Sequence, residues 1–540
     1  MKVSGNIVKV ADGTYFPGTI EFKDGRIINI RDEPKRDYER FVIPGFIDAH
    51  VHVESSMLVP SEFARQAVRH GTVASVSDPH EIANVLGDTG VRFMIENGKN
   101  VPFKFFFGAP SCVPATAFET SGAKLGVPDV QRLLQQDDIL YLSEMMNFPG
   151  VISGDPDCLA KIAAAKKLGK PIDGHAPGLR GDALKKYISA GISTDHECFE
   201  IEEAKEKIEL GMKIIIREGS AARNFDELLP LVDSHPDSVM FGSDDKHPNE
   251  LIKGHINELV MRAVGAGINW RKVLKCACIN PIEHYGLPVG RLRIGDSADF
   301  VIVDDLSKLK VRETYIAGEL VAVDGNTNAP TMSCDAVNRF KCTKKIPENF
   351  QVRAGGASIQ IIEAVDGQIV TGRAVEQVKA EAGFAVPDTS RDILKLTVVN
   401  RYNDAPPAVA FVRGFGLKKG AMASSVAHDS HNIIAVGADD VSLARAVNEV
   451  IRYQGGMTVV TESSVDILSL PVAGLMTNAD GGTVAREYDN LEKKAKSLGL
   501  RLASPFMTLS FMALLVIPSL KLSDKGLFDG DKFDFAPLFV

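Results

Sequence analysis

The stretch that decides the fold is Pro44 to Met57, PGFIDAHVHVESSM. It begins as an apolar, strand-like run and ends in His50-Val-His52, which Glu54 follows. Along a β-strand, residues i and i+2 point to the same face, so both imidazoles leave the strand in one direction and can reach a common point. An isolated H-x-H is explained equally well by two histidines that are satisfied separately in a polar loop. The rest of the chain decides between these interpretations.

From Phe41 to Gly286 the chain alternates between strand-like and helix-like segments. Eight such strand–helix units occupy about 240 residues, close to the usual size of a (β/α)8 TIM-type barrel. A doubly wound open sheet is the structural alternative. It does not require eight units, and the glycine fingerprint of a dinucleotide site is missing after the first strand. We therefore predict an α/β fold built on a (β/α)8 barrel.

A barrel carries its active site on the loops that follow the carboxyl ends of its strands. Histidines and charged residues follow the predicted strands at these points. In chain order they are His50 and His52; Asp78, His80 and Glu81; Glu144; His175; His196; Arg217 and Glu218; and Asp244 and Asp245. A random scatter of the chain's 12 histidines would place many of them on helices instead.

Imidazoles and carboxylates that converge on one barrel mouth form a divalent metal site. Four histidines and two acids are too many ligands for one ion that keeps a position open for water, whereas two ions sharing a carboxylate use all six. In this scheme His50, His52 and Asp244 hold one ion, His175 and His196 hold the other, and Glu144 bridges them. Two cations lower the pKa of a shared water, so that hydroxide exists at neutral pH. The predicted chemistry is hydrolysis at a carbon bonded to nitrogen or oxygen.

The order of these groups resembles the amidohydrolase superfamily, and the flanking segments are similar to the adenine deaminase family within it. The segments that carry the resemblance are FIDAHVHVESSM, SDPHEIANVLG, SEMMNFPGVISG, DGHAPGL, IREGSAARN and, towards the C-terminus, VAHDSHNIIAVG and PFMTLSFMALLVIPSLKL. The resemblance implies hydrolysis of adenine to hypoxanthine and ammonia, with manganese as the favoured metal and iron or zinc as alternatives. It also implies that Glu144 stands where many superfamily members carry a carboxylated lysine.

The chemistry of such a reaction suggests roles for the remaining groups. Hydroxide attacks C6 of the purine, and Asp244 takes the proton of the attacking water and passes it to the leaving amine. The superfamily pattern, an aspartate directly after Gly-Ser, selects Asp244, and alternation along a strand predicts that Asp245 points away from the mouth. Glu144, Asp78 or Glu81 would protonate N1. The candidates for binding the substrate are Asp78, His80, Glu81, Arg217 and Glu218. The alternative is that these five orient the metal ligands.

Two further units are expected outside the barrel, which we place at residues 44–286. Residues 1–43 and 287–330 read as short strands separated by DG and GD turns, and they should pair into one small composite β domain. Residues 345–540 form an additional C-terminal α+β domain. This domain contains His428-Asp-Ser-His431, for which a second site, a structural or interface role and a position over the barrel mouth all remain open.

Composition limits the other functions. The net charge of −9 gives no electrostatic footprint for nucleic acid. The apolar run Phe506–Ile517 is too short to cross a bilayer. Seven scattered cysteines argue against a disulfide framework, so we expect a cytoplasmic protein. The expected partners are adenine and water, without nucleic acid or membrane, in a homo-oligomer. The rival functions are a cyclic amidase of the hydantoinase or dihydroorotase type and a non-catalytic binding protein, although the latter should lack ligands.

Overall fold

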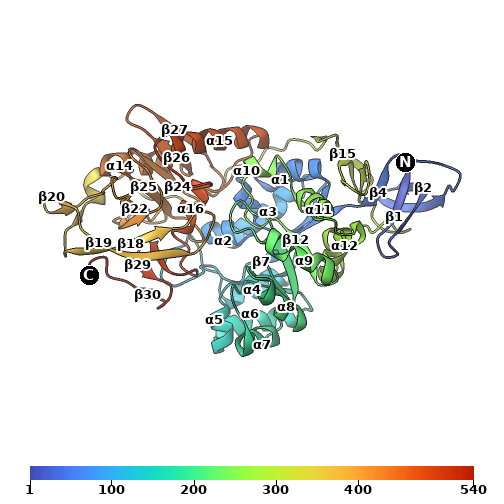
Figure 1. The fold of residues 1–540 in the computed structure, drawn as a ribbon, viewed down its shortest axis with the longest axis horizontal. Helices are drawn as coiled ribbons and strands as arrows, with labels where there is room; N and C mark the ends of the chain where they lie inside the picture. The colour runs from blue at the N-terminus through green and yellow to red at the C-terminus, as the bar shows by residue number, and fades with distance from the viewer.

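The eight predicted barrel strands are present in a computed structural model, which describes all 540 residues (Figure 1). They are β5 (Phe46–Val51), β6 (Thr72–Ser77), β7 (Lys104–Ala109), β8 (Ile139–Met145), β9 (Ile172–Gly174), β10 (Thr194–Asp195), β11 (Lys213–Arg217) and β12 (Val239–Gly242). Neighbouring strands pair in parallel from β5 to β9 and from β10 to β12. The predicted (β/α)8 barrel is confirmed.

Backbone contacts join these two sheets into a closed ring. A parallel bridge links Val51 to Asp244, and the amide of Asp244 donates to the carbonyl of His50 over 2.9 Å. On the other side, the amide of Ser193 donates to the carbonyl of Ile172 over 3.0 Å. Closure between β5 and β12 therefore sets His50 beside Asp244, although most of the barrel sequence separates them.

Helices cover the barrel, and several of them bury one apolar face. In α9 (Phe225–Ser234) the buried residues include Phe225, Leu228 and Leu231, at the spacing of one helix face. The other helices of this region are α1 (Pro60–Ala67), α2 (His80–Leu86), α3 (Asp88–Gly98), α4 (Val127–Leu134), α5 (Phe148–Ser153), α6 (Pro156–Lys167), α7 (Gly181–Ser189), α8 (Ile201–Glu209), α10 (Pro248–Leu251), α11 (Ile256–Gly265), α12 (Trp270–Leu274) and α13 (Asn280–Tyr285).

One eight-stranded sheet contains strands from both sides of the barrel sequence, in the order β16-β15-β14-β13-β4-β1-β2-β3. Strand β4 joins the two halves, because it pairs in parallel with β1 and antiparallel with β13. The strands are β1 (Lys2–Lys9), β2 (Thr14–Lys23), β3 (Arg26–Asp32), β4 (Phe41–Pro44), β13 (Phe300–Val303), β14 (Val311–Ile316), β15 (Glu319–Val323) and β16 (Asn326–Thr327). Figure 1 places β1 and β2 at the end of the molecule opposite the C-terminal sheet.

The C-terminal region is built on a second eight-stranded sheet, in the order β19-β18-β23-β22-β25-β24-β26-β27. Helix α14 (Asp440–Tyr453) packs on it through a buried face that includes Leu443, Val447 and Val450. The strands are β18 (Ser358–Ala364), β19 (Thr371–Gln377), β22 (Leu394–Val399), β23 (Ala408–Arg413), β24 (Ala421–Ser424), β25 (Ile433–Gly437), β26 (Gly456–Val460) and β27 (Val465–Ser469). Short strands β17 (Val352–Arg353), β20 (Ala380–Glu381) and β21 (Phe384–Ala385) form a small sheet beside it.

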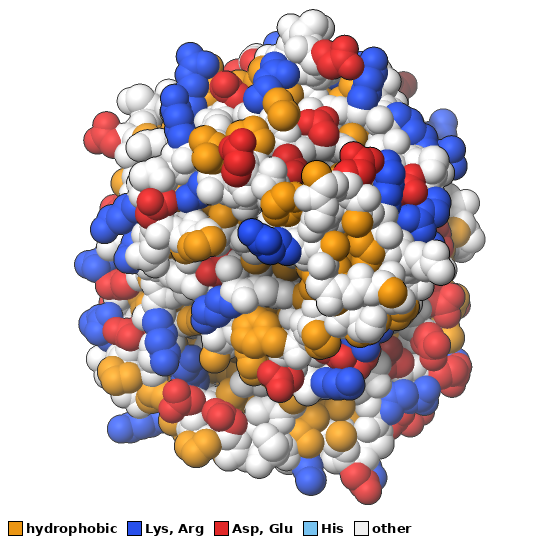
Figure 2. Space-filling view, turned by 90° about the vertical axis from the view of Figure 1, so that its left-hand side faces the viewer, with side chains coloured by type: hydrophobic (Ala, Val, Ile, Leu, Met, Phe, Trp, Pro, Cys, Tyr) orange, Lys and Arg blue, Asp and Glu red, His pale blue; other side chains and the backbone are white.

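The last part of the chain returns towards the barrel. It contains α15 (Gly481–Ser497), α16 (Pro505–Phe511), β28 (Leu520–Ser523), β29 (Gly526–Asp529) and β30 (Asp534–Phe535). The apolar run predicted to be a core element begins in α16, and nearly all its side chains are buried. No helix of the structure combines the length and apolar character needed to cross a membrane. Figure 2 shows the end of the molecule that the C-terminal region forms. Basic and acidic side chains are interspersed on this face.

Candidate active site

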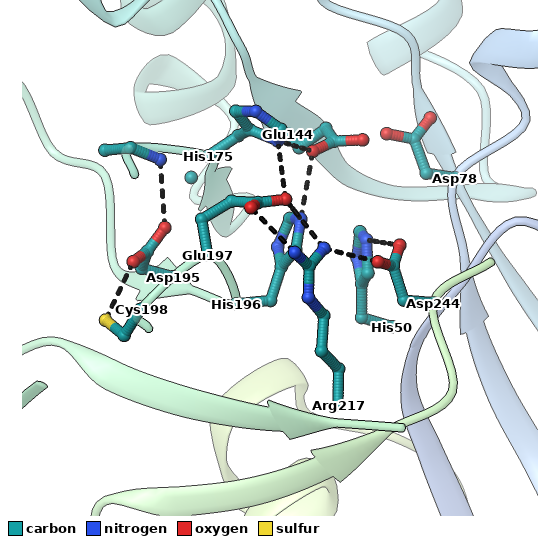
Figure 3. A network of polar contacts seen from close by, with 12 residues as sticks. His50, Asp78, Glu144, His175, Asp195, His196, Glu197, Cys198, Arg217 and Asp244 are labelled. Carbon is teal, nitrogen blue, oxygen red and sulfur yellow. Dashed lines mark hydrogen bonds and ion pairs between the residues drawn. The ribbon is translucent and has the colours of Figure 1, made fainter. Parts of the chain in front are cut away.

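Histidines and acids from six barrel strands meet at the carboxyl ends of those strands (Figure 3). His50 lies in β5, His52 follows it directly, and Asp244 follows β12. The Oδ1 atom of Asp244 lies 3.4 Å from His50 Nε2 and 3.2 Å from His52 Nε2. All three side chains are buried. Both imidazoles of the H-x-H pair therefore face one carboxylate, as the strand periodicity requires.

The carboxylate of Glu144, at the end of β8, lies between two sets of histidines. Its Oε1 atom is 3.3 Å from His52 Nε2. Its Oε2 atom is 2.8 Å from His175 Nδ1 and 3.2 Å from His196 Nε2. Each oxygen thus faces a different set of imidazoles, which is the arrangement that a carboxylate shared between two cations needs.

The cluster fits divalent metal ions. Neither ring nitrogen of His50 has a hydrogen-bond partner, and neither does Nε2 of His175, although all three atoms are buried. Buried polar atoms normally find partners, so imidazole nitrogens without one, next to carboxylates, fit the coordination of a cation. The ligand atoms of His50, His196 and Asp244 lie within 4.8 Å of one another, and so do those of Glu144, His175 and His196.

A buried ion-pair network supports these side chains, and it includes Glu197, which was not among the predicted site residues. Arg217, at the end of β11, donates two hydrogen bonds of 2.7 Å to Glu197 and also binds Asp244. Glu197 Oε1 in turn lies 3.4 Å from His175 Nδ1 and from His196 Nε2. Burial alone would raise the pKa of Glu197, but Arg217 and the two histidines lower it to about 2. Glu197 directly follows a strand-end histidine, and this position was the signal that could have identified it.

The prediction that only Asp244 faces the mouth is wrong, because Asp245 also lines the pocket. Alternation holds only within a strand, and β12 ends at Gly242. Asp244 has a left-handed backbone, with φ of 51°, so the next side chain is not sent to the opposite side. Asp245 Oδ1 accepts a hydrogen bond of 2.5 Å from the hydroxyl of Ser55, whereas Asp244 faces the histidines.

The five candidate substrate-binding residues occupy different positions. His80, Glu81 and Arg217 line the pocket, although Arg217 is already engaged by two carboxylates. Asp78 lies behind His80, with its Oδ2 atom 3.2 Å from His80 Nδ1. Glu218 does not line the pocket, because its carboxylate pairs with Arg262 at 2.7 Å. The end of β11 therefore directs Arg217 inward and Glu218 outward.

The C-terminal region completes the pocket. His428 and His431, whose position the sequence left open, lie over the barrel mouth. His428 Nε2 lies 3.1 Å from Glu81 Oε1, and His431 Nε2 contacts the other oxygen of Glu81. The same region contributes an apolar wall to the pocket. Its members are Ile369, Phe511, Leu514 and Val516. Candidate metal ligands and an apolar wall thus line the same pocket.

A (β/α)8 barrel with this cluster of imidazoles and carboxylates at its mouth defines a metal-dependent hydrolase of the amidohydrolase type. The sequence profile described as Amidohydrolase family matches residues 41–321, and that of the Adenine deaminase C-terminal domain matches residues 368–534. A curated adenine deaminase of Salinibacter ruber is 58% identical over 100% of this chain and 99% of its own length. Those of Sulfurovum sp. and Methanosarcina mazei are 54% and 53% identical, over 99% and 100% of this chain and 99% of their own lengths.

The chain therefore belongs to the adenine deaminase family of amidohydrolases. As a member of that family it is an enzyme that hydrolyses C–N bonds, and the family implies a divalent metal. The candidate metal-binding cluster lies where the barrel fold places its active site.

Proposed function

We propose that this protein hydrolyses adenine to hypoxanthine and ammonia. The observation that carries the proposal is the meeting of five of the six potential metal ligands with the apolar C-terminal wall in one pocket, while His50 lies directly behind them against Asp244. Such a wall suits a flat purine ring, and the ligands suit attack at a carbon bonded to nitrogen. The names of the relatives across the full chain support the same substrate.

We assign one ion to His50, His52 and Asp244 and the other to His175 and His196, with Glu144 shared between them. When bound, such a pair of ions lowers the pKa of water and supplies hydroxide near neutral pH. Manganese is favoured by the family resemblance, while imidazole and carboxylate ligands also suit iron and zinc.

The protein's own side chains handle the protons. Asp244 accepts the proton of the attacking water and passes it to the leaving amine. Arg217 and the two histidines of the H-x-H pair orient its carboxylate. Glu81 lines the same pocket between His428 and His431. Burial alone would raise the pKa of Glu81, but His428, His431 and His80 lower it well below its ordinary value, so the carboxylate is ionised. We assign to it the transfer of the second proton of the attacking water to N1.

A substrate screen tests the proposed function. Purified protein loaded with Mn²⁺ should release ammonia from adenine but not from cytosine. Dihydroorotate, followed by loss of its ultraviolet absorbance, should remain intact, because it represents the cyclic amidase alternative. Opening of dihydroorotate without ammonia release from adenine would reject the proposal.

We expect two equivalents of divalent metal per chain after gentle purification or reconstitution. Elemental analysis measures this directly. Variants His50→Ala and His175→Ala should each lose metal together with activity, because each removes a ligand from a different proposed ion. A metal content that stays near one equivalent in reconstituted wild-type protein would contradict the shared-carboxylate arrangement.

Free adenine should be a better substrate than adenosine. The relatives of this chain are named for the free base, and the C-terminal wall narrows the pocket at the barrel mouth. Comparison of kcat/KM for the two compounds, by ammonia release under the same metal loading, gives the answer. A higher kcat/KM for adenosine would mean that the assignment to the free base is wrong.

We also propose domain boundaries at 1–43 with 287–330, at 44–286 and at 345–540. The sheet that unites β4 with β13 supports the composite domain.

The seven cysteines are all free, which supports a cytoplasmic location. We propose a homo-oligomer in addition, for which the sedimentation coefficient of the purified protein is the test.

A further inference from the structure

One acidic side chain in the pocket is not among the six proposed metal ligands. Asp429 lies on the loop between β24 and β25, lines the pocket and is only 3% exposed. Its Oδ2 atom has no hydrogen-bond partner. Burial and the nearby Glu81 raise the pKa of Asp429 to about 6. A buried carboxyl oxygen without a partner is costly unless a ligand donates a hydrogen bond to it.

The loop that carries Asp429 is fixed in place. The hydroxyl of Tyr402 donates to the carbonyl of Ser430 over 2.6 Å, and the side-chain amide of Asn432 donates to the carbonyl of Thr120 over 2.8 Å. His428 Nδ1 lies 2.7 Å from the hydroxyl of Ser510. Contacts with the barrel and with α16 therefore hold the carboxylate in one position before any ligand binds.

Asp429 is also separated from the proposed metal ligands. His80 stands between them, with its Nδ1 atom 3.5 Å from Glu144 Oε1. His80 also lies close to Glu81 and Asp429. One nitrogen or oxygen atom from each of these three side chains lies within 4.8 Å of the other two. A purine whose C6 faces the cluster thus extends the rest of its ring system towards Asp429 and the apolar wall.

We propose that Asp429 selects the free base by accepting a hydrogen bond from the N–H of the five-membered ring of the purine. This inference rests on the proposed function. Neutral adenine and hypoxanthine each carry one such N–H, on N7 or N9, whereas a purine substituted at N9 has none. A site built to bind an N–H rejects analogues that lack it, because the buried acceptor then stays unpaired.

The test compares adenine with 9-methyladenine in wild-type protein and in Asp429→Asn, using steady-state kinetics with Mn²⁺. Asparagine keeps the shape of the side chain but loses the charged acceptor. We expect the kcat/KM ratio of adenine to 9-methyladenine to fall by about tenfold to a hundredfold in the variant, mainly through KM, the range of a hydrogen bond to a charged group. Asp466→Asn, in β27 of the same domain, is the matched control and should leave the ratio unchanged.

Three outcomes would overturn the proposal. An unchanged ratio in Asp429→Asn would mean that any discrimination is steric. Loss of a full metal equivalent from the variant would make Asp429 a cation ligand together with His80 and Glu81. Equal binding of adenine and 9-methyladenine by wild-type protein in calorimetry would exclude the N–H contact without any variant. Ammonia release from adenine by wild-type protein tests the proposed function separately, so the two failures are distinguishable.

Discussion

Replacing Asp244 with asparagine should lower kcat by about 10²–10⁴-fold or more, the usual range for loss of a general acid–base group. Burial alone would raise the pKa of Asp244, but Arg217, His50 and His52 lower it well below its ordinary value, so the side chain is an ionised base at neutral pH. Asparagine retains an oxygen for a metal but cannot accept a proton. Steady-state kcat and metal content of the same preparation should therefore diverge, with activity lost and much of the metal kept.

Asp245→Asn is the matched control for this prediction. Asp245 lines the same pocket but accepts a hydrogen bond from Ser55 and lies 3.6 Å from His428 Nε2. It contacts neither Glu144 nor the histidine pair of β5 through a hydrogen bond. We expect a milder loss of kcat in this variant. Near-normal turnover in Asp244→Asn would show that another acid moves the proton.

Replacing Glu144 with glutamine should cost both metal and activity. The two oxygens of Glu144 face different sets of histidines, and the amide nitrogen of glutamine cannot replace one of them as a ligand. Metal ions contribute several kcal/mol of transition-state stabilisation, so kcat should fall by about 10³-fold or more. Elemental analysis should give clearly fewer than two equivalents of metal.

Glu202→Gln is the control for the Glu144 variant, because Glu202 lies on the outer helix α8 and pairs only with Lys205. It should keep wild-type metal content and kcat. If Glu144→Gln retained two equivalents and normal turnover under the same reconstitution, Glu144 would not be shared between two ions, and the assignment of ligands would have to change.

The barrel and the positions of its strand-end residues were predictable from local patterns. His50 and His52 are two residues apart in a strand, so their common direction follows from strand geometry alone. The alternation of strands and helices indicated which end of the barrel carries the site. The proximity of His50 to Asp244 follows as soon as the barrel closes, because β5 and β12 must then be neighbours.

Other features depended on geometry that no local pattern contains. The direction of Asp245 was set by the left-handed backbone of Asp244, beyond the end of β12. Glu197 became part of the site only because Arg217, on a neighbouring strand, binds it across the barrel mouth.

The position of the C-terminal region is the clearest case of a feature that only the tertiary structure decided. In the sequence, His428 and Asp429 stood in an isolated loop with no ligand cluster nearby. In the folded chain His428 contacts Glu81, and both loop residues line the pocket. The sequence determined the barrel and its metal-binding chemistry, because strand periodicity is local. Packing between distant segments decided which side chains surround the substrate, because such contacts leave no periodic signal in a single sequence.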